Sequence, residues 1–487
     1  MSYLTRATAV LFFILTLCPT ADAREGDVRF FKVANTQFDP YIENPNAEQR
    51  QWMLDHYDRM KGWSPRFDQE LHWYVRGWFY KDAYGIKPDW AVFAEHPEWI
   101  LRDTAGNMLY VPFACSGGTC PQFAADFGNP DFRAFWIAEA QDVMGRGYQG
   151  VWIDDVNMTW RVSDGNANPV TPFDPRTGAP MLLDDWRRYM AEFMEEARVA
   201  LSASEIAHNM IWYAGPEDNS NPFITRQIDA ADFINLERGV TDLGLTGGNG
   251  RFALTTFLEF IDYLHGRGKN VILLDEALST TQRQYALAGW LAINDGNDLM
   301  ASENNSWTSP DSWWPGYDVT LGNALGPRYE WQTLIRRDFE CGLILMNPPD
   351  RPGVPVAFGQ SYSTIDGATV SAMTLAGDQS AVLLDACATA PADADADGVV
   401  DDADNCLEVA NPAQRDTNGD GFGNLCDPDL NGDGVVNATD LALLRGAFFS
   451  ALDPDADFDG DGLVNALDLG ILRSYFFDVP GPSGIAP

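Results

Sequence analysis

The sequence is poor in positive charge and in histidine. Its 487 residues include 32 Lys and Arg against 71 Asp and Glu, a formal net charge of −39, and five His. Such an acidic chain is repelled by nucleic acid and by anionic lipid, so we expect neither as a partner. The sequence also lacks an HExxH pattern, a P-loop, a GxSxG elbow and a dinucleotide fingerprint. These absences argue against zinc-hydrolase, phosphate-transfer, serine-hydrolase and nicotinamide chemistry.

Long apolar runs are scarce as well. The run AVLFFILTLC near the N-terminus is too short to span a bilayer, and Ala21 and Ala23 supply the small residues of a cleavage site. This pattern predicts a secretory signal peptide over residues 1–23. Cys18 is the alternative sign of a lipoprotein, but Leu17 stands before it where a small residue is usual. We therefore expect a secreted or cell-surface protein without a membrane span.

Cysteines are few, and none forms a CxxC pair of the kind that binds metal. Export makes disulfides the better interpretation of the six cysteines that follow the signal peptide. The expected pairs are Cys115–Cys120, which bracket the short loop SGGT, Cys406–Cys426 in the acidic tail and, by elimination alone, Cys341–Cys387. Because six cysteines allow several connectivities, the last pair stays open at this point.

Aromatic residues and charge are divided unevenly along the chain. All 16 Trp precede residue 332, whereas residues 388–487 carry 20 Asp and Glu against three Arg. We therefore expect a globular region with a large apolar core, followed by an acidic tail of a different kind.

The first region alternates short apolar runs with longer amphipathic segments. Expected strands cover residues 29–35, 72–80, 148–155, 209–215, 232–239, 270–277 and 298–304, and expected helices cover 44–61, 130–146, 183–202, 253–267 and 280–293. This alternation favours parallel strands joined by helices, and the number of units predicts an α/β fold, a (β/α)8 TIM barrel, over residues 24–341. Four further apolar runs separated by turn residues predict a small antiparallel β domain over residues 342–388.

The tail contains two loops with oxygen ligands at the spacing of an EF-hand. In DLNGDGVVNATD and DFDGDGLVNALD, side-chain oxygens stand at positions 1, 3, 5, 9 and 12, and Gly stands at position 6. The expected calcium ligands are Asp429, Asn431, Asp433, Asn437 and Asp440 in the first loop, and Asp457, Asp459, Asp461, Asn465 and Asp468 in the second. Each loop is followed by an apolar helix. The pair resembles a type I dockerin over residues 429–480, with residues 481–487 as a tail.

The dockerin resemblance implies a cohesin-type domain or a cell-surface scaffold as partner. The pairs Ala438-Thr439 and Ala466-Leu467 stand at positions ten and eleven, where well-known dockerins have Ser-Thr, so the identity of the partner stays open.

Two further acidic repeats precede the dockerin. Their expected ligands are Asp393, Asp395, Asp397, Asp401 and Asp404, followed by Asp416, Asn418, Asp420, Asn424 and Asp427. With their Asn-Cys and Leu-Cys-Asp contexts, these segments resemble thrombospondin type 3 repeats over residues 389–428. We expect Ca²⁺ as a structural ion of the tail and no cofactor for catalysis. The alternative, a disordered acidic linker, would apply if no cation were bound.

Acidic residues stand where several predicted strands end. Asp154 and Asp155 close GVWIDD, Glu237 closes INLE, Asp275 and Glu276 close VILLDE, and Glu303 closes LMASE. Carboxyl ends of barrel strands form the active site, and buried carboxylates are costly unless they serve a purpose. Glycoside hydrolysis uses two such carboxylates. We predict Asp154, Asp155 and Glu237 as catalytic residues and Asp275, Glu276 and Glu303 as substrate contacts.

Each of these assignments has a structural alternative. Strand alternation turns one of Asp154 and Asp155 away from the site, and Glu237 could instead pair with Arg226 or Arg238. Asp275, Glu276 and Glu303 could also cap loops. Aromatic rings stack on sugars, so we predict Trp78, Tyr80, Trp152 and Trp313 as further substrate contacts, with packing in the core as the alternative.

Several segments resemble one known family. WYVRGWFYKDAYGIKPDW, GYQGVWIDDVN, DFINLERG and GLILMNPP resemble the hypothetical glycosyl hydrolase family numbered fifteen over roughly residues 70–385. That family is similar in layout to the polygalactosaminidase barrels of family 114, in which an Asp after the fourth strand acts with a Glu after a later strand. The resemblance implies that Asp154 or Asp155 acts with Glu237.

The sequence is thus best interpreted as a secreted glycoside hydrolase that cleaves a polysaccharide and carries a calcium-dependent anchoring tail. A barrel that binds glycan without cutting it, displayed on a calcium-binding stalk, is the alternative. A transglycosylase using the same residues is a third interpretation. The sugar, the linkage, retention or inversion, and endo or exo action stay open.

Overall fold

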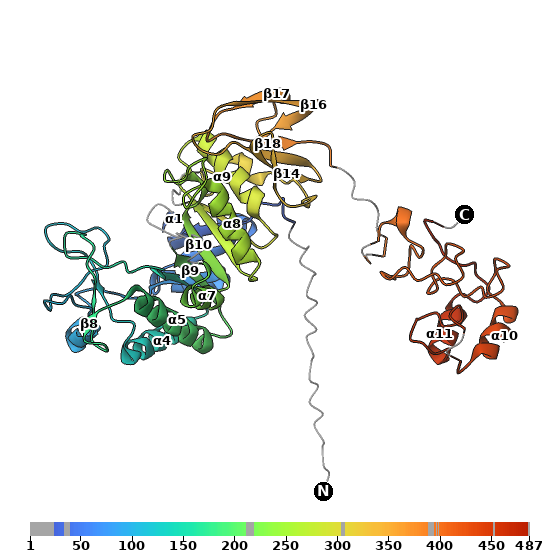
Figure 1. Cartoon of the computed structure of the whole chain (residues 1–487), viewed down its shortest axis with the longest axis horizontal. Coiled ribbons are helices and arrows are strands. Elements are labelled where there is room, and N and C mark those ends of the chain that lie inside the picture. Colours follow the sequence, from blue (N-terminus) through green and yellow to red (C-terminus); the bar gives the residue numbers. More distant parts are fainter. Residues whose placement is uncertain are drawn as a thin grey trace, which may run out of the picture. The chain divides into compact units, whose positions relative to one another are not determined.

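The computed structural model describes residues 24–33, 39–210, 219–302, 307–387, 394–395, 397, 399–450 and 453–485 (Figure 1). The expected signal peptide, Glu303 and Asp393 lie outside the described residues. The chain divides into two compact units, Met1–Cys387 and Ala388–Pro487. Within the described ranges, no helix combines the length and apolarity needed to cross a bilayer.

Eight parallel strands form a closed barrel in the first unit. The strands are β1 (Phe30–Val33), β2 (Tyr57–Gly62), β3 (Gly77–Asp82), β6 (Gly150–Asp154), β9 (Glu205–Met210), β10 (Phe233–Arg238), β11 (Asn270–Asp275) and β12 (Leu299–Ser302). Their order around the barrel follows the sequence, and β1 closes it by pairing with both β12 and β2. The predicted (β/α)8 barrel is confirmed.

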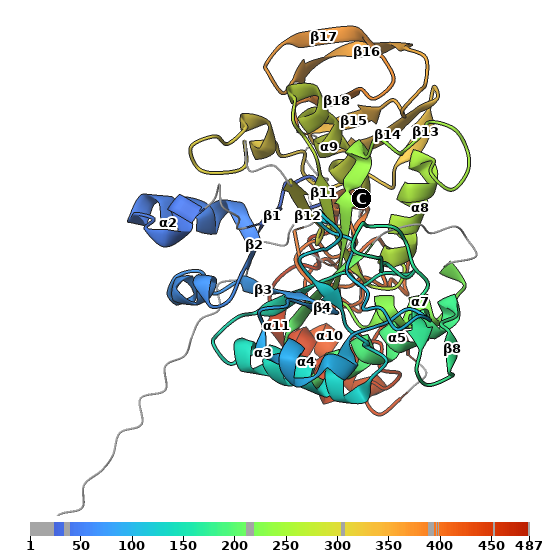
Figure 2. The ribbon, with the colours of Figure 1, turned by 90° about the vertical axis from the view of Figure 1, so that its left-hand side faces the viewer.

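Helices surround the strands (Figure 2). The main ones are α2 (Ala47–His56), α4 (Pro130–Met144), α5 (Leu183–Ala200), α7 (Pro222–Asp229), α8 (Leu254–His265) and α9 (Thr280–Ile293); shorter ones are α1 (Asp39–Glu43), α3 (Ala91–Glu95) and the 3-10 helices η1 (Arg66–His72), η2 (Pro97–Trp99), η3 (Gly239–Thr241) and η4 (Pro315–Asp318). Five of the main helices were predicted, whereas α7 was not. Local signals fix their starts: Ser279 forms a capping box with Gln282, and Asn129 caps α4 ahead of Pro130.

The segments after β3 and after β6 each contribute one small sheet beside the barrel. The first sheet pairs β4 (Gly85–Ile86) with β5 (Phe123–Ala124), and the second pairs β7 (Phe173–Asp174) with β8 (Ala179–Pro180). The predicted disulfide between Cys115 and Cys120 closes a turn in the segment between β3 and β6.

Strand β2 replaces the second half of the helix predicted over 44–61. The helix ends at His56, and YDRMKG continues as a strand. Arg59 and Lys61 point into the barrel, where their charged groups lie over the rings of Trp78 and Trp152. Because charged residues occupy the inward positions, this strand has no apolar pattern that the sequence could reveal.

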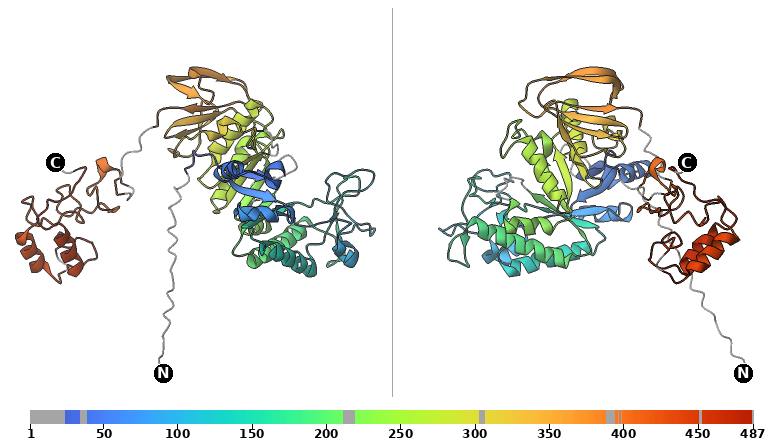
Figure 3. Two further views of the ribbon diagram at one scale, coloured as in Figure 1. Left: turned by 180° about the vertical axis from the view of Figure 1, so that it is seen from behind. Right: turned by 45° about the vertical axis from the view of Figure 1, so that its right-hand side comes forward.

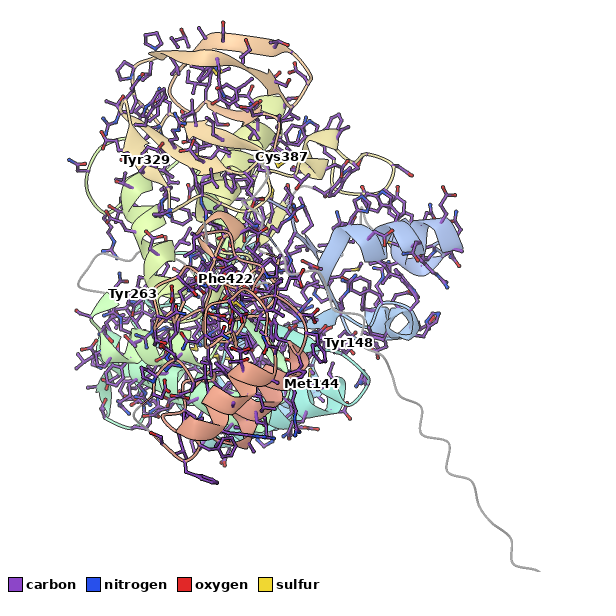
Figure 4. All side chains as sticks on the ribbon, turned by 90° about the vertical axis from the view of Figure 1, so that its right-hand side faces the viewer. Met144, Tyr148, Tyr263, Tyr329, Cys387 and Phe422 are labelled. Carbon is purple, nitrogen blue, oxygen red and sulfur yellow. A yellow bond between two sulfur atoms is a disulfide. The ribbon has the colours of Figure 1, made fainter. Side chains whose placement is uncertain are left out.

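A six-stranded antiparallel sheet completes the first unit. Its strands are β13 (Tyr329–Trp331), β14 (Leu334–Phe339), β15 (Gly342–Met346), β16 (Val354–Thr364), β17 (Thr369–Leu375) and β18 (Ser380–Leu384), in the order β13-β14-β15-β18-β16-β17. The sheet therefore begins before residue 342, where the sequence placed its start. Helix α9 packs against β14, β15 and β18. Figure 4 labels Tyr329 on the first strand and Cys387 after the last, and Cys387 forms the disulfide with Cys341 that was expected by elimination.

The second unit contains the acidic repeats. Its helices are η5 (Asp401–Ala403), α10 (Ala438–Ala447) and α11 (Ala466–Ser474), and the last two follow the two predicted calcium loops. A small core, which includes Val436, Leu444, Phe458 and Leu472, joins the two loop–helix repeats. The predicted disulfide Cys406–Cys426 is present.

Candidate active site

Asp154 and Glu237 are brought together at the carboxyl end of the barrel. Asp154 ends β6, Glu237 lies near the end of β10, and β9 runs between these strands. The side-chain amide of Asn209 on β9 donates to both acids, to Asp154 Oδ1 at 2.8 Å and to Glu237 Oε1 at 2.7 Å. The bridged oxygens of the two acids are therefore no further apart than two hydrogen-bond lengths.

The orientation of Asn209 is fixed by a second amide. Asn235 Nδ2 donates to Asn209 Oδ1 at 2.8 Å, and both side chains are buried. The Asn209 carbonyl oxygen therefore faces Asn235, and its NH2 group faces the acids. Sequence reasoning missed Asn209 because it placed this strand over 209–215, so that Asn209 stood at its start. The strand is Glu205–Met210, and Asn209 lies at its carboxyl end.

Asp154 accepts two further hydrogen bonds. The hydroxyl of Tyr80 on the neighbouring strand β3 donates to Asp154 Oδ2 at 2.9 Å, and the backbone N–H of Asp155 donates to Oδ1 at 2.9 Å. Burial, together with the negative charge of Asp154, raises the pKa of Tyr80 far above its usual value. Tyr80 thus remains a hydrogen-bond donor to Asp154, and these contacts fix the orientation of the Asp154 side chain.

Asp155 takes a different role from Asp154. It adopts a left-handed backbone conformation, with φ of 58°, and its buried carboxylate accepts from Arg161 Nη1 at 2.9 Å and from Asn157 Nδ2 at 3.0 Å. Burial first, and then the negative charge of Asp154, raises the pKa of Asp155 to about 7. Of the two adjacent acids, Asp154 is therefore the one that joins Glu237.

Asp82 is an acid of the site that sequence reasoning missed. Its Cα is paired with that of Asp154 in the register of β3 and β6, and Oδ1 accepts from the backbone N–H of Tyr84 at 2.8 Å. Burial, and then the charges of Asp155 and Asp154, raises its pKa well above the usual range. Asp82 ends its strand as Asp154 does, so the criterion of an acid at a strand end would have found it.

Several predicted substrate contacts are wrong. Trp78 is 0% exposed and donates from Nε1 to Glu205, the first residue of β9, so it fills the amino end of the barrel. Trp152 is 2% exposed and packs in the same interior cluster. Asp275 is fully buried and accepts from the backbone and the hydroxyl of Thr241, both at 2.9 Å. None of the three can contact a substrate in this structure.

Of the other predicted substrate contacts, Trp313 is packed and Glu276 is exposed. Trp313 packs against Phe30 and Trp52, with ring centroids 5.2 Å away in both cases, and is not brought to the acids. Glu276 is exposed after β11 and stays a prediction. The alternative ion pair between Glu237 and Arg226 is also wrong, because Arg226 pairs with Glu195 at 2.6 Å.

A surface groove of about 600 Å³ between α4 and α5 is no part of this site. It is lined by apolar residues such as Ile137 and Val199 and by Glu192, Glu195 and Glu196. Figure 3 shows the two helices, teal and green, side by side in the outer layer of the barrel. The strand-end acids are absent from its lining, so we assign it no catalytic role.

The calcium loops of the second unit have the expected shape. Asp457, Asp459 and Asp468 offer oxygens that all lie within 4.8 Å of one another, and Asp395, Asp397 and Asp404 do the same. Gly434 and Gly462, at position 6 of their loops, have φ of 85° and 89°, which glycine adopts without strain. An oxygen-only ligand set of this kind fits Ca²⁺.

The turns of these loops are already formed by hydrogen bonds. Asp429 and Asp457, at position 1, accept from the backbone N–H of Gly434 at 2.6 Å and of Gly462 at 3.1 Å. At the other end of each loop, Asn437 with Asp440 and Asn465 with Asp468 form capping boxes that begin α10 and α11.

Comparison with known proteins agrees with the fold and the tail. The model of the hypothetical glycosyl hydrolase family 15 matches residues 74–343, and the chain belongs to this family. A type I dockerin domain matches residues 427–477 and a thrombospondin type 3 repeat matches residues 385–414. All three resemblances are thereby confirmed. Both tail modules are calcium-binding types, and dockerin domains are typical of extracellular or cell-surface proteins. A search of curated proteins found no match.

Solved structures with a similar fold include glycoside hydrolases. The glycoside hydrolase domain of PelA from Pseudomonas aeruginosa is 13% identical, with 57% of this chain and 94% of that chain covered and a TM-score of 0.35. The noncanonic maltogenic α-amylase AmyB from Thermotoga neapolitana is 12% identical, with 74% and 98% covered and a TM-score of 0.43.

Proposed function

We propose that this chain is an exported glycoside hydrolase that cleaves a polysaccharide with Asp154 and Glu237. The observation that carries the proposal is the shared amide of Asn209, which holds two carboxylates from different strands side by side at the carboxyl end of the barrel. Two carboxylates at this distance are the machinery that glycosidic bond cleavage requires.

The spacing of the two acids supports a retaining mechanism. Retaining enzymes hold their carboxyl groups about 5–5.5 Å apart, whereas inverting enzymes leave about 6.5–9.5 Å for a water molecule. Two hydrogen bonds of 2.8 and 2.7 Å to one nitrogen bring the acids to the shorter range.

In this mechanism, Asp154 attacks the anomeric carbon while Glu237 gives its proton to the departing glycosidic oxygen. The product is a glycosyl ester on Asp154 and a free sugar hydroxyl. Glu237 then takes a proton from water, the water oxygen attacks the same carbon, and the ester bond to Asp154 breaks. Tyr80 and Asn209 position Asp154 for the first step.

The tail supplies anchoring in this proposal. The dockerin would attach the enzyme to a cohesin-type domain or a cell-surface scaffold, and Ca²⁺ would hold the tail folded without taking part in hydrolysis. The sequence features that support export are the predicted signal peptide and the six paired cysteines.

The test is hydrolysis of a panel of neutral, acidic and amino-sugar polysaccharides, followed as new reducing ends. Asp154→Asn and Glu237→Gln should each lower the rate by about a thousandfold. Glu259→Gln is the control and should leave the rate unchanged, because Glu259 is an exposed acid on the outer helix α8. Azide should rescue the nucleophile variant, and NMR of the first product should show the anomeric configuration of the substrate. Full activity in both acid variants would refute the assignment.

A barrel that binds glycan without cleaving it is the competing function. A binding barrel of this kind would hold its strand-end acids far apart or in ion pairs. Asp154 and Glu237 are instead bridged by the side-chain amide of Asn209, which argues against this alternative. Binding to a polysaccharide with no release of reducing ends would favour this alternative.

A further inference from the structure

Trp63 presents an exposed ring next to the proposed nucleophile. It follows β2 directly and is 41% exposed, whereas most tryptophans of the barrel are packed. Its ring centroid lies 5.5 Å from that of Tyr80, with 37° between the planes. Because the Tyr80 hydroxyl donates to Asp154, one side chain separates the exposed ring from the catalytic carboxylate.

The ring of Trp63 is the outer member of an aromatic group on three neighbouring strands. Tyr80 stacks on Trp152 at 5.7 Å with 27° between the planes. The ammonium group of Lys61 lies 3.7 Å from the Trp152 centroid, 5.3 Å from that of Tyr80 and 5.5 Å from that of Trp63. Lys61 therefore lies within cation–π distance of all three rings and links them into one group.

The backbone that carries Trp63 is held on both sides. A Cβ on Gly62 would stand 2.4 Å from the ring of Phe67, so only glycine allows the chain to pass under this ring. The carbonyl of Trp63 accepts from the N–H of Phe67 at 2.9 Å. The backbone at Trp63 is therefore held in place before any ligand binds.

The next residues are tied to helix α4. Arg146, just after α4, donates to Ser64 Oγ at 2.9 Å and to Asp68 at 3.1 Å. Tyr148, labelled in Figure 4, donates from its hydroxyl to Asp68 at 2.8 Å. These contacts restrain the turn after β2, so Trp63 has little conformational freedom to lose on binding.

We propose that Trp63 is a sugar-binding platform, and that it holds a pyranose unit of the polysaccharide beside the bond that Asp154 and Glu237 cleave. A pyranose ring has a face of C–H groups that packs on an indole, and a rigid exposed indole binds it without ordering cost. The inference rests on the proposed function. The substrate class that follows is a chain with at least two linked pyranose units. One unit would lie between the two acids, and a second would pack on Trp63, which lies outside the pair.

The experiment separates binding from hydrolysis. The full-length Glu237→Gln chain is run in native gels that contain β-glucan, chitosan or polygalacturonate, and its retardation gives an apparent Kd for each polymer. The same gels are run with Trp63→Ala and Trp63→Phe added in that background. The matched control is Tyr329→Ala, because Tyr329 is 44% exposed and lies on β13, in the antiparallel sheet.

We expect at least one gel to retard the parent chain. In that gel, Trp63→Ala should weaken the apparent Kd by about tenfold, Trp63→Phe should retain most of the binding, and Tyr329→Ala should change nothing. The proposal that Trp63 binds sugar is overturned if the Trp63→Ala and Tyr329→Ala chains are retarded equally. It is also overturned if no gel retards the parent chain. Circular dichroism of each variant checks its fold. If Trp63→Ala is unstable, Trp63→Gln takes its place, because it also removes the aromatic ring and should weaken binding to the same extent.

The two proposals fail in different ways. A chain that binds through Trp63 but releases no reducing ends from any polymer refutes the hydrolase and keeps the platform. A wild-type chain that hydrolyses a polymer with the same KM as Trp63→Ala refutes the platform and keeps the hydrolase.

Discussion

The barrel and the tail hold their carboxylates in opposite ways. At the barrel site, neutral donors surround the acids: Asn209 and Tyr80 contact Asp154, and Asn209 also contacts Glu237. In the tail, the oxygens of Asp457, Asp459 and Asp468 converge within 4.8 Å of one another, where a bound cation would relieve their repulsion. Neutral side chains of the chain itself therefore contact Asp154 and Glu237, whereas the oxygen cluster of the tail is arranged as a cation site is.

The largest effect that this contrast predicts is seen on chelation. Removal of Ca²⁺ with EGTA should unfold residues 394–485 and leave the barrel folded and active. All 16 Trp precede residue 332, so tryptophan fluorescence reports on the barrel alone, while hydrogen exchange followed by mass spectrometry reports on the tail. A fall in fluorescence or in hydrolysis on chelation would show that the two regions depend on each other.

Loss of the shared amide should have the next largest effect. Asn209→Ala should lower kcat by about a hundredfold and move the pH profile of kcat, because both acids lose a hydrogen bond to the same group. Tyr80→Phe removes one bond to Asp154 alone and should cost about tenfold. An unchanged pH profile in Asn209→Ala would reduce Asn209 to a structural residue.

A buried acid in the barrel should make its stability depend on pH. Burial raises the pKa of Asp275 to about 7, so the folded barrel binds a proton between about pH 4 and 7 that the unfolded chain releases. The free energy of unfolding should therefore decrease as the pH rises through this range, by up to about 1.4 kcal/mol per pH unit. Asp275→Asn should reduce this slope, to which Asp155 and Asp82 also contribute, in urea titrations followed by tryptophan fluorescence. An unchanged slope would mean that Asp275 stays ionised.

The smallest effect concerns a contact within the tail. Arg415, which directly follows the residues matched by the thrombospondin type 3 repeat, donates to the backbone carbonyls of Pro454 and Asp457 at the start of the second dockerin loop. In the presence of Ca²⁺, Arg415→Ala should lower the free energy of unfolding of the tail by about 2 kcal/mol. The exposed Arg445→Ala is the control and should change it by less than about 0.5 kcal/mol. Equal effects of both would mean that the repeat and the dockerin fold independently.

The features that could be predicted from the sequence are those encoded in local patterns. Apolar strands, capped helices and the glycine and ligand spacing of the calcium loops all lie within short segments, so the barrel, five of its main helices and the tail modules were found. Strand β2 was missed because Arg59 and Lys61 occupy its inward positions. Trp63 was missed with it, since the residue before it was assigned to no strand.

The site shows the same limit. Asp154 and Glu237 could be proposed because acids at strand ends are visible in sequence, but Asn209 connects them only once β9 is placed correctly. Trp78, Trp152 and Asp275 have the residue types of a sugar site, yet strand register alone decides that they face the core or a neighbouring loop. Register depends on contacts between distant segments, which a single sequence does not display.

The disulfide between Cys341 and Cys387 has a mechanical consequence. Cys387 is the last residue of the first unit, and Cys341 stands just before β15. If the dockerin tethers the enzyme to a surface, tension on the tail enters at Cys387 and passes through the covalent bridge to Cys341. Strands β15 to β18 lie inside the closed loop, so shear on an anchored molecule cannot peel them away one after another.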